Sequence, residues 1–271
     1  MNKNKFYLSK NIRLKVLRMV HEAKASHIGS CFSIADIIAV LYGSVLNVKA
    51  KNAAWENRDR FILSKGHGAA AVYAALAFCD FMSIEELDNY GKEGSILMTH
   101  ISHKIDGVEF STGSLGHGLP FAVGKAMSAK ILGKTWRTFV LLSDGELDEG
   151  SNWEAFMFAA HHKLDNLTVI IDYNKLQSLA SVEETLGLEP LVGKLEAFGF
   201  SVSELDGHNL NKLEDVIKSA PWSKNKPSAI IAHTIKGKGV SFMENKVEWH
   251  YKSPNNDELF KAISEIEINY A

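Results

Sequence analysis

Hydrophobic residues follow two patterns along this chain, short continuous runs and longer segments with a helical repeat. The continuous runs are rich in β-branched or aromatic residues, which predicts buried strands. Such runs occupy 61–63, 138–142 and 167–171, and further strands are expected at 200–205 and 228–233. Elsewhere apolar residues recur every three or four positions, which predicts helices with one buried face. These are expected at 9–25, 33–46, 69–78, 83–90, 119–132, 151–163, 190–198, 210–220 and 257–270.

Strands that alternate with helices predict an α/β fold, with a mostly parallel sheet and helices on both of its faces. The chain has 271 residues, of which 46% are hydrophobic and 23% charged. A chain of this size and composition can bury the core of one large domain. We therefore expect a single domain over residues 1–271.

Polar residues stand directly after two neighbouring strands. Asp144 lies at the end of the run 138–142, and Asn174 lies just after the run 167–171. A right-handed crossover brings the carboxyl ends of both strands to one edge of the sheet, so both side chains should face one crevice. A carboxylate, an amide oxygen and a nearby backbone carbonyl suit Mg²⁺ when phosphate oxygens complete its shell. The spacing therefore favours a magnesium and diphosphate site, although Asp-Gly alone can equally be a turn.

Asp-Gly followed about thirty residues later by Asn at the next strand end resembles the thiamine-diphosphate fingerprint. The residues around it resemble the transketolase family, with Ser143 in place of the family's usual Gly. The resemblance implies three metal ligands, the side chains of Asp144 and Asn174 and the backbone carbonyl of Leu176. We assign the following Gly145 and Glu146, together with Asn174, to the cofactor, although an acid in a first helical turn also suits the helix dipole.

Two glycines flank His67 in Ser64-Lys65-Gly66-His67-Gly68, immediately before the predicted helix 69–78. Glycines there let the free N–H groups of a helix approach an anion, which favours a diphosphate. The segment resembles the family's Ser-x-Gly-His-Gly, whose histidine meets the cofactor diphosphate. His67 is therefore expected to bind the cofactor, whereas without the resemblance a core histidine in a turn remains an alternative.

Three more histidines acquire a role only through the resemblance. His27 matches a loop histidine that contacts the sugar, with Ser26 and Ile28 replacing the family's Gly and Pro. His103 is expected beside the substrate, although the segment from His103 to Gly113 looks shorter than in full-length transketolases, and His100 is expected to be structural. His250, in Trp249-His250-Tyr251-Lys252, matches a histidine that reaches both diphosphate and substrate. The resemblance also implies that Gly113, Ser114 and Leu115 contact the cofactor.

The resemblance covers nearly the whole chain and implies the diphosphate-binding subunit of a split transketolase. Such an enzyme moves a two-carbon ketol unit from a ketose to an aldose, on sugars or sugar phosphates. The chain should then need a separate subunit with the pyrimidine-binding domain, as a dimer or heterotetramer. The alternatives are another thiamine-diphosphate enzyme, such as a deoxyxylulose phosphate synthase or an oxoacid dehydrogenase subunit, and a non-catalytic cofactor-binding partner. A nucleotide-dependent enzyme is disfavoured because neither a Walker loop nor the dinucleotide glycine pattern occurs.

Charge and cysteine content bear on the partners and on the cellular compartment of the protein. The formal net charge of −2 gives no electrostatic reason to expect nucleic acid or an anionic membrane as partner. Cys31 and Cys79 lack metal-like spacing, which favours a reduced cytoplasmic interior. We also expect no stretch long enough to span a bilayer.

Overall fold

A five-stranded, wholly parallel sheet forms the centre of the computed structural model, which describes residues 4–270. Its strands are β1 (Arg60–Leu63), β2 (Thr138–Ser143), β3 (Leu167–Tyr173), β4 (Ser201–Asp206) and β5 (Ser228–His233). The order across the sheet is β1-β2-β3-β5-β4, with every neighbouring pair parallel. All carboxyl ends therefore lie along one edge, as the sequence predicted.

Side chains that alternate along β2 build two separate cores. Phe139 and Leu141 join one buried cluster, while Val140 and Leu142 join the other. Successive strand residues point to opposite faces, so a run that is apolar throughout requires cover on both sides. This confirms the predicted α/β fold class with helices on both faces.

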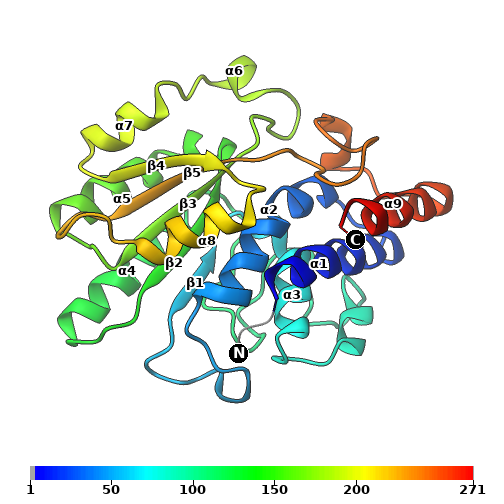
Figure 1. The fold of residues 1–271 in the computed structure, drawn as a ribbon, viewed down its shortest axis with the longest axis horizontal. Helices are drawn as coiled ribbons and strands as arrows, with labels where there is room; N and C mark the ends of the chain where they lie inside the picture. The colour runs from blue at the N-terminus through cyan, green and yellow to red at the C-terminus, as the bar shows by residue number, and fades with distance from the viewer. Residues whose placement is uncertain (1–3, 271) are drawn as a thin grey trace.

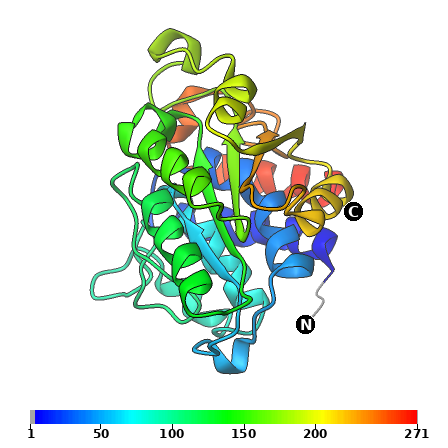
Figure 2. The ribbon, with the colours of Figure 1, turned by 90° about the vertical axis from the view of Figure 1, so that its left-hand side faces the viewer.

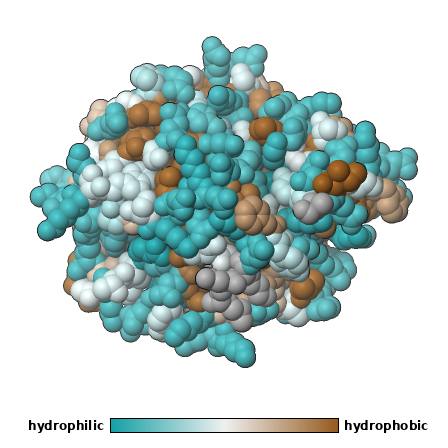
Figure 3. Space-filling model, in the orientation of Figure 1, coloured by the Kyte–Doolittle hydropathy of each residue, from teal (hydrophilic) through white to brown (hydrophobic). Residues whose placement is uncertain are grey.

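The two groups of helices lie on opposite sides of the sheet (Figures 1 and 2). One face is covered by α1 (Lys5–Glu22), α2 (Ile28–Val40), α3 (Ala69–Phe78), α8 (Leu210–Ser219) and α9 (Asn256–Asn269). The other is covered by α4 (Gly118–Ile131), α5 (Gly150–His161) and α7 (Leu191–Ala197). The face seen in Figure 3 is mostly hydrophilic, with hydrophobic residues scattered in small groups.

Four segments differ from the predicted elements. The helix expected to reach residue 46 changes to a π-helix over Leu41–Val45, and the one expected at 83–90 is a short 3₁₀ turn, Glu85–Asn89. A short helix α6 (Val182–Thr185) lies in a segment expected to be a loop, because Ser181 and Glu184 form a reciprocal capping box. Val247–His250 forms a further 3₁₀ turn next to the site described below.

We expected no stretch long enough to span a bilayer. This expectation is wrong when only the length and the apolar composition of the helices are considered. The segment Ile28–Val45 has 18 residues and is apolar enough to qualify, but 94% of it is buried inside the fold. It contains α2, which packs between α1, α3 and α8 in the described structure and is apolar on all sides for that reason.

Candidate functional site

A cavity of about 220 Å³ opens at the carboxyl edge of the sheet. Ligands of parallel α/β proteins bind in this place, outside the ends of the strands. Ten predicted or newly identified residues line it together: His27, Lys65, His67, His100, Gly113, Leu115, Asp144, Asn174, Lys236 and His250. Gly145 and Leu176 line it as well. The site therefore gathers residues from segments that are far apart in the chain.

Asp144 and Asn174 meet in this cavity because β2 and β3 are paired in register, with Ser143 opposite Asp172. The Asp144 carboxylate accepts hydrogen bonds from the backbone N–H of Gly145 at 2.7 Å and of Lys175 at 2.5 Å. Burial, and then the nearby Asp172 carboxylate, raise the pKa of Asp144 to about 7. Asp172 is already paired with the Lys65 ammonium, so a divalent cation bound here would chiefly stabilise the charged form of Asp144.

Asp172 determines how the Asn174 amide is oriented. The Nδ2 of Asn174 donates to Asp172 Oδ2 at 3.1 Å, so the amide oxygen is left for the opposite side. That oxygen accepts a hydrogen bond from the backbone N–H of Leu176 at 3.0 Å and keeps a second lone pair. The orientation therefore supplies an oxygen donor beside Asp144, as a hard metal ion requires.

Lys236 is 1% exposed and lines the same cavity. Its three donor positions are directed to the carbonyl oxygens of Leu176 at 3.1 Å and Gln177 at 2.8 Å, and to His250 Nδ1 at 3.1 Å. Burial, and then the charge of Lys65, lower the pKa of Lys236 to about 8. The carbonyl oxygen of Leu176, a predicted metal ligand, thus already accepts a hydrogen bond from the Lys236 ammonium. An anion could bind beside this positive charge.

His67 occupies the position expected of a diphosphate contact. It lies in a 3₁₀ turn, Gly66–Gly68, that leads directly into α3. A Cβ added at Gly66 would lie 2.3 Å from the backbone oxygen of Thr112, so this turn can pack only with glycine there. The helix N-terminus and His67 therefore face the cavity together.

Four imidazole rings cluster at the mouth of the site. The centroid of the His27 ring lies 5.2 Å from that of His67, 5.6 Å from that of His100 and 4.9 Å from that of His250. His27 has a left-handed backbone, φ 75°, a conformation that non-glycine residues adopt rarely and that is concentrated at functional sites. Its N–H donates to the His250 carbonyl oxygen at 2.7 Å, which joins the two loops.

These histidines are neutral at pH 7. Burial, and then the neighbouring His100, lower the pKa of His27 to about 4. Burial, and then Lys236, lower the pKa of His250 to about 3, and burial also lowers the pKa of His67 and of His100. Neutral imidazoles can both donate and accept protons, which suits them to hold the hydroxyl groups of a sugar.

The two upstream histidines exchange their predicted places. His100, expected to be structural, lines the cavity, and its ring packs beside Gly113. His103, expected beside the substrate, lies on the exposed side of the loop, where its Nδ1 is 2.7 Å from Ser111 Oγ. The sequence held one sign that His100 was the better candidate. The segment from His103 to Gly113 looked too short for the resemblance, and a segment that starts at His100 is three residues longer.

Two other predicted contacts also lie outside the cavity lining. Ser114 is exposed, while its neighbours Gly113 and Leu115 line the cavity. Glu146 is fully buried, and its carboxylate accepts hydrogen bonds from Ser64 Oγ and from the N–H of Gly116 at 2.9 Å. Glu146 thus ties together the two glycine-containing turns beneath the site and is not part of the cavity lining.

A larger hollow of about 550 Å³ lies between α4 and α5. Its lining is mainly apolar and includes Val123, Met127, Ile131, Ala155 and Phe158. A binding site for a charged cofactor needs convergent polar groups. Of these two hollows in the described part of the chain, the smaller one at the sheet edge supplies them.

Comparison with known proteins gives a consistent picture. Residues 5–269 match the family described as transketolase, thiamine diphosphate binding domain. One of the apulose-4-phosphate transketolase subunits, from Actinobacillus succinogenes, is 43% identical over 260 residues, covering 95% of this chain and 94% of that protein. A 6-deoxy-6-sulfo-D-fructose transketolase subunit of Clostridium sp. is 38% identical over 257 residues, covering 94% of each chain.

Solved structures agree with this result. Transketolase from Campylobacter jejuni superimposes with a TM-score of 0.92 at 32% identity, covering 98% of this chain and 43% of that one. Transketolase from Leishmania mexicana also has a TM-score of 0.92, at 28% identity, and 42% of its length is covered. The chain therefore spans less than half the length of these solved transketolases.

Proposed function

Because this chain belongs to the family of transketolase thiamine-diphosphate-binding domains, we propose that it is the diphosphate-binding subunit of a two-subunit transketolase. It would take part in moving a two-carbon ketol unit from a ketose phosphate to an aldose phosphate. One observation carries the proposal. Asp144, Asn174 and Leu176 share a cavity with Lys236 at the carboxyl edge of the sheet.

The residues of this cavity fit a complex of Mg²⁺ with a diphosphate. The Asp144 carboxylate, the Asn174 amide oxygen and the Leu176 carbonyl would hold the metal, as hard oxygen donors. Lys236, His67 and the start of α3 would face the phosphate oxygens, with Lys236 releasing the Leu176 carbonyl to the metal. Thiamine diphosphate, when bound, supplies the nucleophilic carbon and the electron sink of the transfer.

His27, His100 and His250 would hold the hydroxyl groups of the sugar. Their rings surround the mouth of the cavity and are neutral, so each can donate or accept a proton at a sugar oxygen. His100 replaces His103 in this role because it alone of the two lines the cavity.

A second protein would supply the pyrimidine-binding domain. This chain covers 94% of the Actinobacillus succinogenes protein, whose name describes one subunit of a transketolase, but 43% of the single-chain Campylobacter jejuni enzyme. That difference supports a split enzyme, which we propose to be a heterotetramer in the cytoplasm. The relatives named for apulose 4-phosphate and for a sulfonated fructose also support sugar substrates with an anionic group.

Calorimetry tests the cofactor assignment. The purified chain should bind thiamine diphosphate only when Mg²⁺ is present, and should bind neither ATP nor NAD. Binding of either nucleotide without binding of thiamine diphosphate would refute the assignment.

Reconstitution tests the enzymatic role. The chain would be mixed with the product of an adjacent gene encoding a pyrimidine-binding domain, and ketol transfer between ketose and aldose phosphates would be followed. Activity in the mixture and none in either protein alone is expected. Cofactor binding without transfer, for any sugar pair and any such partner, would support a non-catalytic binding protein instead.

A further inference from the structure

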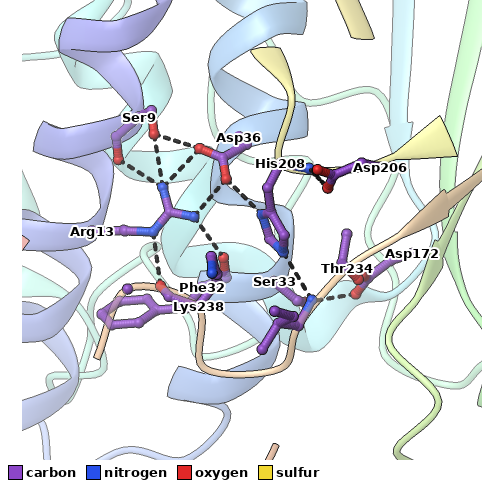
Figure 4. A network of polar contacts seen from close by, with 12 residues as sticks. Ser9, Arg13, Phe32, Ser33, Asp36, Asp172, Asp206, His208, Thr234 and Lys238 are labelled. Atoms are coloured by element: carbon purple, nitrogen blue, oxygen red, sulfur yellow. Dashed lines mark hydrogen bonds and ion pairs between the residues drawn. The ribbon is translucent and has the colours of Figure 1, made fainter. Parts of the chain in front are cut away.

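Asp36 on α2 anchors a buried polar group that lies behind the cavity and does not line it. The Asp36 side chain is 1% exposed, and its oxygens accept hydrogen bonds from the Arg13 guanidinium at 2.9 and 2.8 Å (Figure 4). Arg13 is itself fully buried on α1. Burial alone would raise the pKa of Asp36, but Arg13 and His208 lower it far below its usual range. Asp36 is therefore a permanent carboxylate.

His208 bridges Asp36 to the loop that follows β5. Its Nδ1 lies 2.7 Å from Asp36 Oδ2, and the backbone N–H of Ile235 donates to its Nε2 at 2.8 Å. A carboxylate only accepts and a backbone N–H only donates, so Nδ1 must carry the proton and Nε2 must carry the lone pair. The imidazole thus has one fixed tautomer, with both nitrogens in use.

The bond to Ile235 acts on the residue next to it. Lys236 follows Ile235 directly, and its ammonium is the one that contacts Leu176, Gln177 and His250 in the cavity. The same loop is held on its other side, where Arg13 Nε donates to the Lys238 carbonyl oxygen at 3.0 Å. Arg13, Asp36 and His208 therefore hold the backbone on both sides of Lys236.

We propose that His208, held by Asp36, is a positioning residue that places the Lys236 ammonium at the diphosphate end of the cofactor site. The inference rests on the proposed binding of thiamine diphosphate. His208 is not among the residues that line the cavity, and the hydrogen bonds of its ring go to Asp36 and Ile235, not to a predicted metal ligand. Its effect on the cofactor must pass through the backbone of Ile235 and the side chain of Lys236.

Two substitutions separate the bond to Ile235 from the bond to Asp36. In His208→Asn the amide can replace Nδ1 against Asp36, but it is too short to reach Ile235. In His208→Gln the amide oxygen extends to the former place of Nε2 and can accept from Ile235. We expect His208→Asn to weaken binding of thiamine diphosphate with Mg²⁺ about tenfold, the lower end of the effect of residues that orient a ligand. His208→Gln should bind nearly as the wild type does.

A double-mutant cycle shows whether the effect passes through Lys236. In a Lys236→Met background, His208→Asn should weaken cofactor binding no further. A second measurement needs no cofactor. Hydrogen–deuterium exchange of the peptide that contains Ile235, followed by mass spectrometry, reports the bond from the Ile235 N–H to His208. Exchange of this peptide should become faster in His208→Asn, and it should stay at the wild-type rate in His208→Gln.

The outcomes are distinct. Unchanged hydrogen exchange and unchanged cofactor affinity in His208→Asn would overturn the inference, as would a loss of the same size in the Lys236→Met background. If the wild type fails to bind thiamine diphosphate, the proposed function fails, while hydrogen exchange still decides whether His208 holds the loop that carries Lys236. Should His208→Asn not fold, His208→Met replaces it, because Met has the length of Gln without a strong acceptor.

Discussion

Lys65 and Asp172 form an ion pair in which both side chains are fully buried beneath the cavity. Asp172 also accepts hydrogen bonds from Ser33 Oγ at 2.7 Å and from Thr234 Oγ1. One carboxylate therefore joins α2, the turn after β1 and the end of β5, and in addition orients Asn174. The Asp172 carboxylate therefore stabilises both the floor of the site and the packing of these three segments against one another.

Removing the cation from this pair should unfold the domain readily. Lys65→Met leaves the Asp172 charge buried without its partner, which costs about 3–5 kcal/mol of unfolding free energy. Urea denaturation followed by circular dichroism would measure the loss. Lys218→Met is the control, because Lys218 pairs with Glu214 on the exposed face of α8 and should cost about 0.3–0.5 kcal/mol. Equal urea midpoints for the two variants would contradict this account.

Asp144→Asn should selectively weaken the binding of Mg²⁺. The substitution keeps the size of the side chain but removes its charge, so Mg²⁺ should bind about 100-fold more weakly, at least as large a loss as removal of an outer-shell partner causes. Mg²⁺ titrations with saturating thiamine diphosphate would measure this loss. Asp148→Asn is a matched control, because Asp148 is nearby, contacts Gln177 and does not line the cavity. A wild-type Mg²⁺ affinity in Asp144→Asn would show that the metal lies elsewhere.

His100 and His103 should differ in their effect on the sugar. In the assembled enzyme, His100→Asn should raise KM for the ketose about fivefold, as expected for the loss of one neutral hydrogen bond. His103→Asn should leave KM unchanged because His103 lies outside the cavity. Steady-state kinetics on both variants decide between them. A larger effect at His103 would restore the assignment made from the sequence.

Two glycines of α4 should respond in opposite directions to alanine. A Cβ at Gly118 would lie 2.3 Å from Ser64 Oγ and 2.6 Å from Ser64 Cα, so Gly118→Ala should lower the free energy of unfolding by about 1–3 kcal/mol. A Cβ at Gly124 meets no atom within 4 Å. Gly124→Ala should therefore raise the free energy of unfolding by about 0.5–1 kcal/mol, since alanine favours the helix. Urea denaturation of both variants tests the pair, and a destabilised Gly124→Ala would contradict the packing.

His27 should make the fold sensitive to mild acid. In the unfolded chain its pKa is about 6.5, whereas burial and His100 lower the folded-state pKa to about 4. As the pH falls below about 6.5, the unfolded state binds a proton that the folded state does not, so stability falls. Wild type should thus lose stability relative to His27→Asn between pH 7 and pH 5.

Urea midpoints of both proteins at pH 5, 7 and 8 would measure this difference. Between pH 7 and pH 8 the unfolded chain loses only a small remaining fraction of its proton at His27 and the folded state loses none, so the difference between the two proteins should change little there. A difference that is also constant from pH 7 to pH 5 would show that His27 titrates normally in the folded protein.

Regular elements made part of the site predictable from sequence. Asp144 and Asn174 were placed together correctly because each ends a strand, and the rule for parallel crossovers fixes which edge those ends share. His67 lines the same cavity from the glycine-flanked turn before α3, and its contact with a cofactor stays a prediction. In both cases the periodic pattern determines the direction of the side chain.

The rest depends on contacts that no periodic pattern encodes. His100 and His103 lie in an irregular segment, where a spacing of three residues does not determine which side chain points inward. The Lys236 ammonium reaches the carbonyls of Leu176 and Gln177 only because the loop after β5 folds back over the end of β3. Asp172 has the appearance of one more polar residue at a strand end until its partners from three other segments are seen.

Because the strands are parallel, the residues of the site stand on two kinds of scaffold, the ends of strands and the segments that connect them to helices. Asp144 and Asn174 stand at the tips of central strands, whereas His27, His100 and His250 stand on connecting segments above them. Connecting segments can change in length and composition while the strands keep their register. On the proposed assignment, changes in these segments could therefore alter which sugar binds while the strand-end contacts to the coenzyme stay in place.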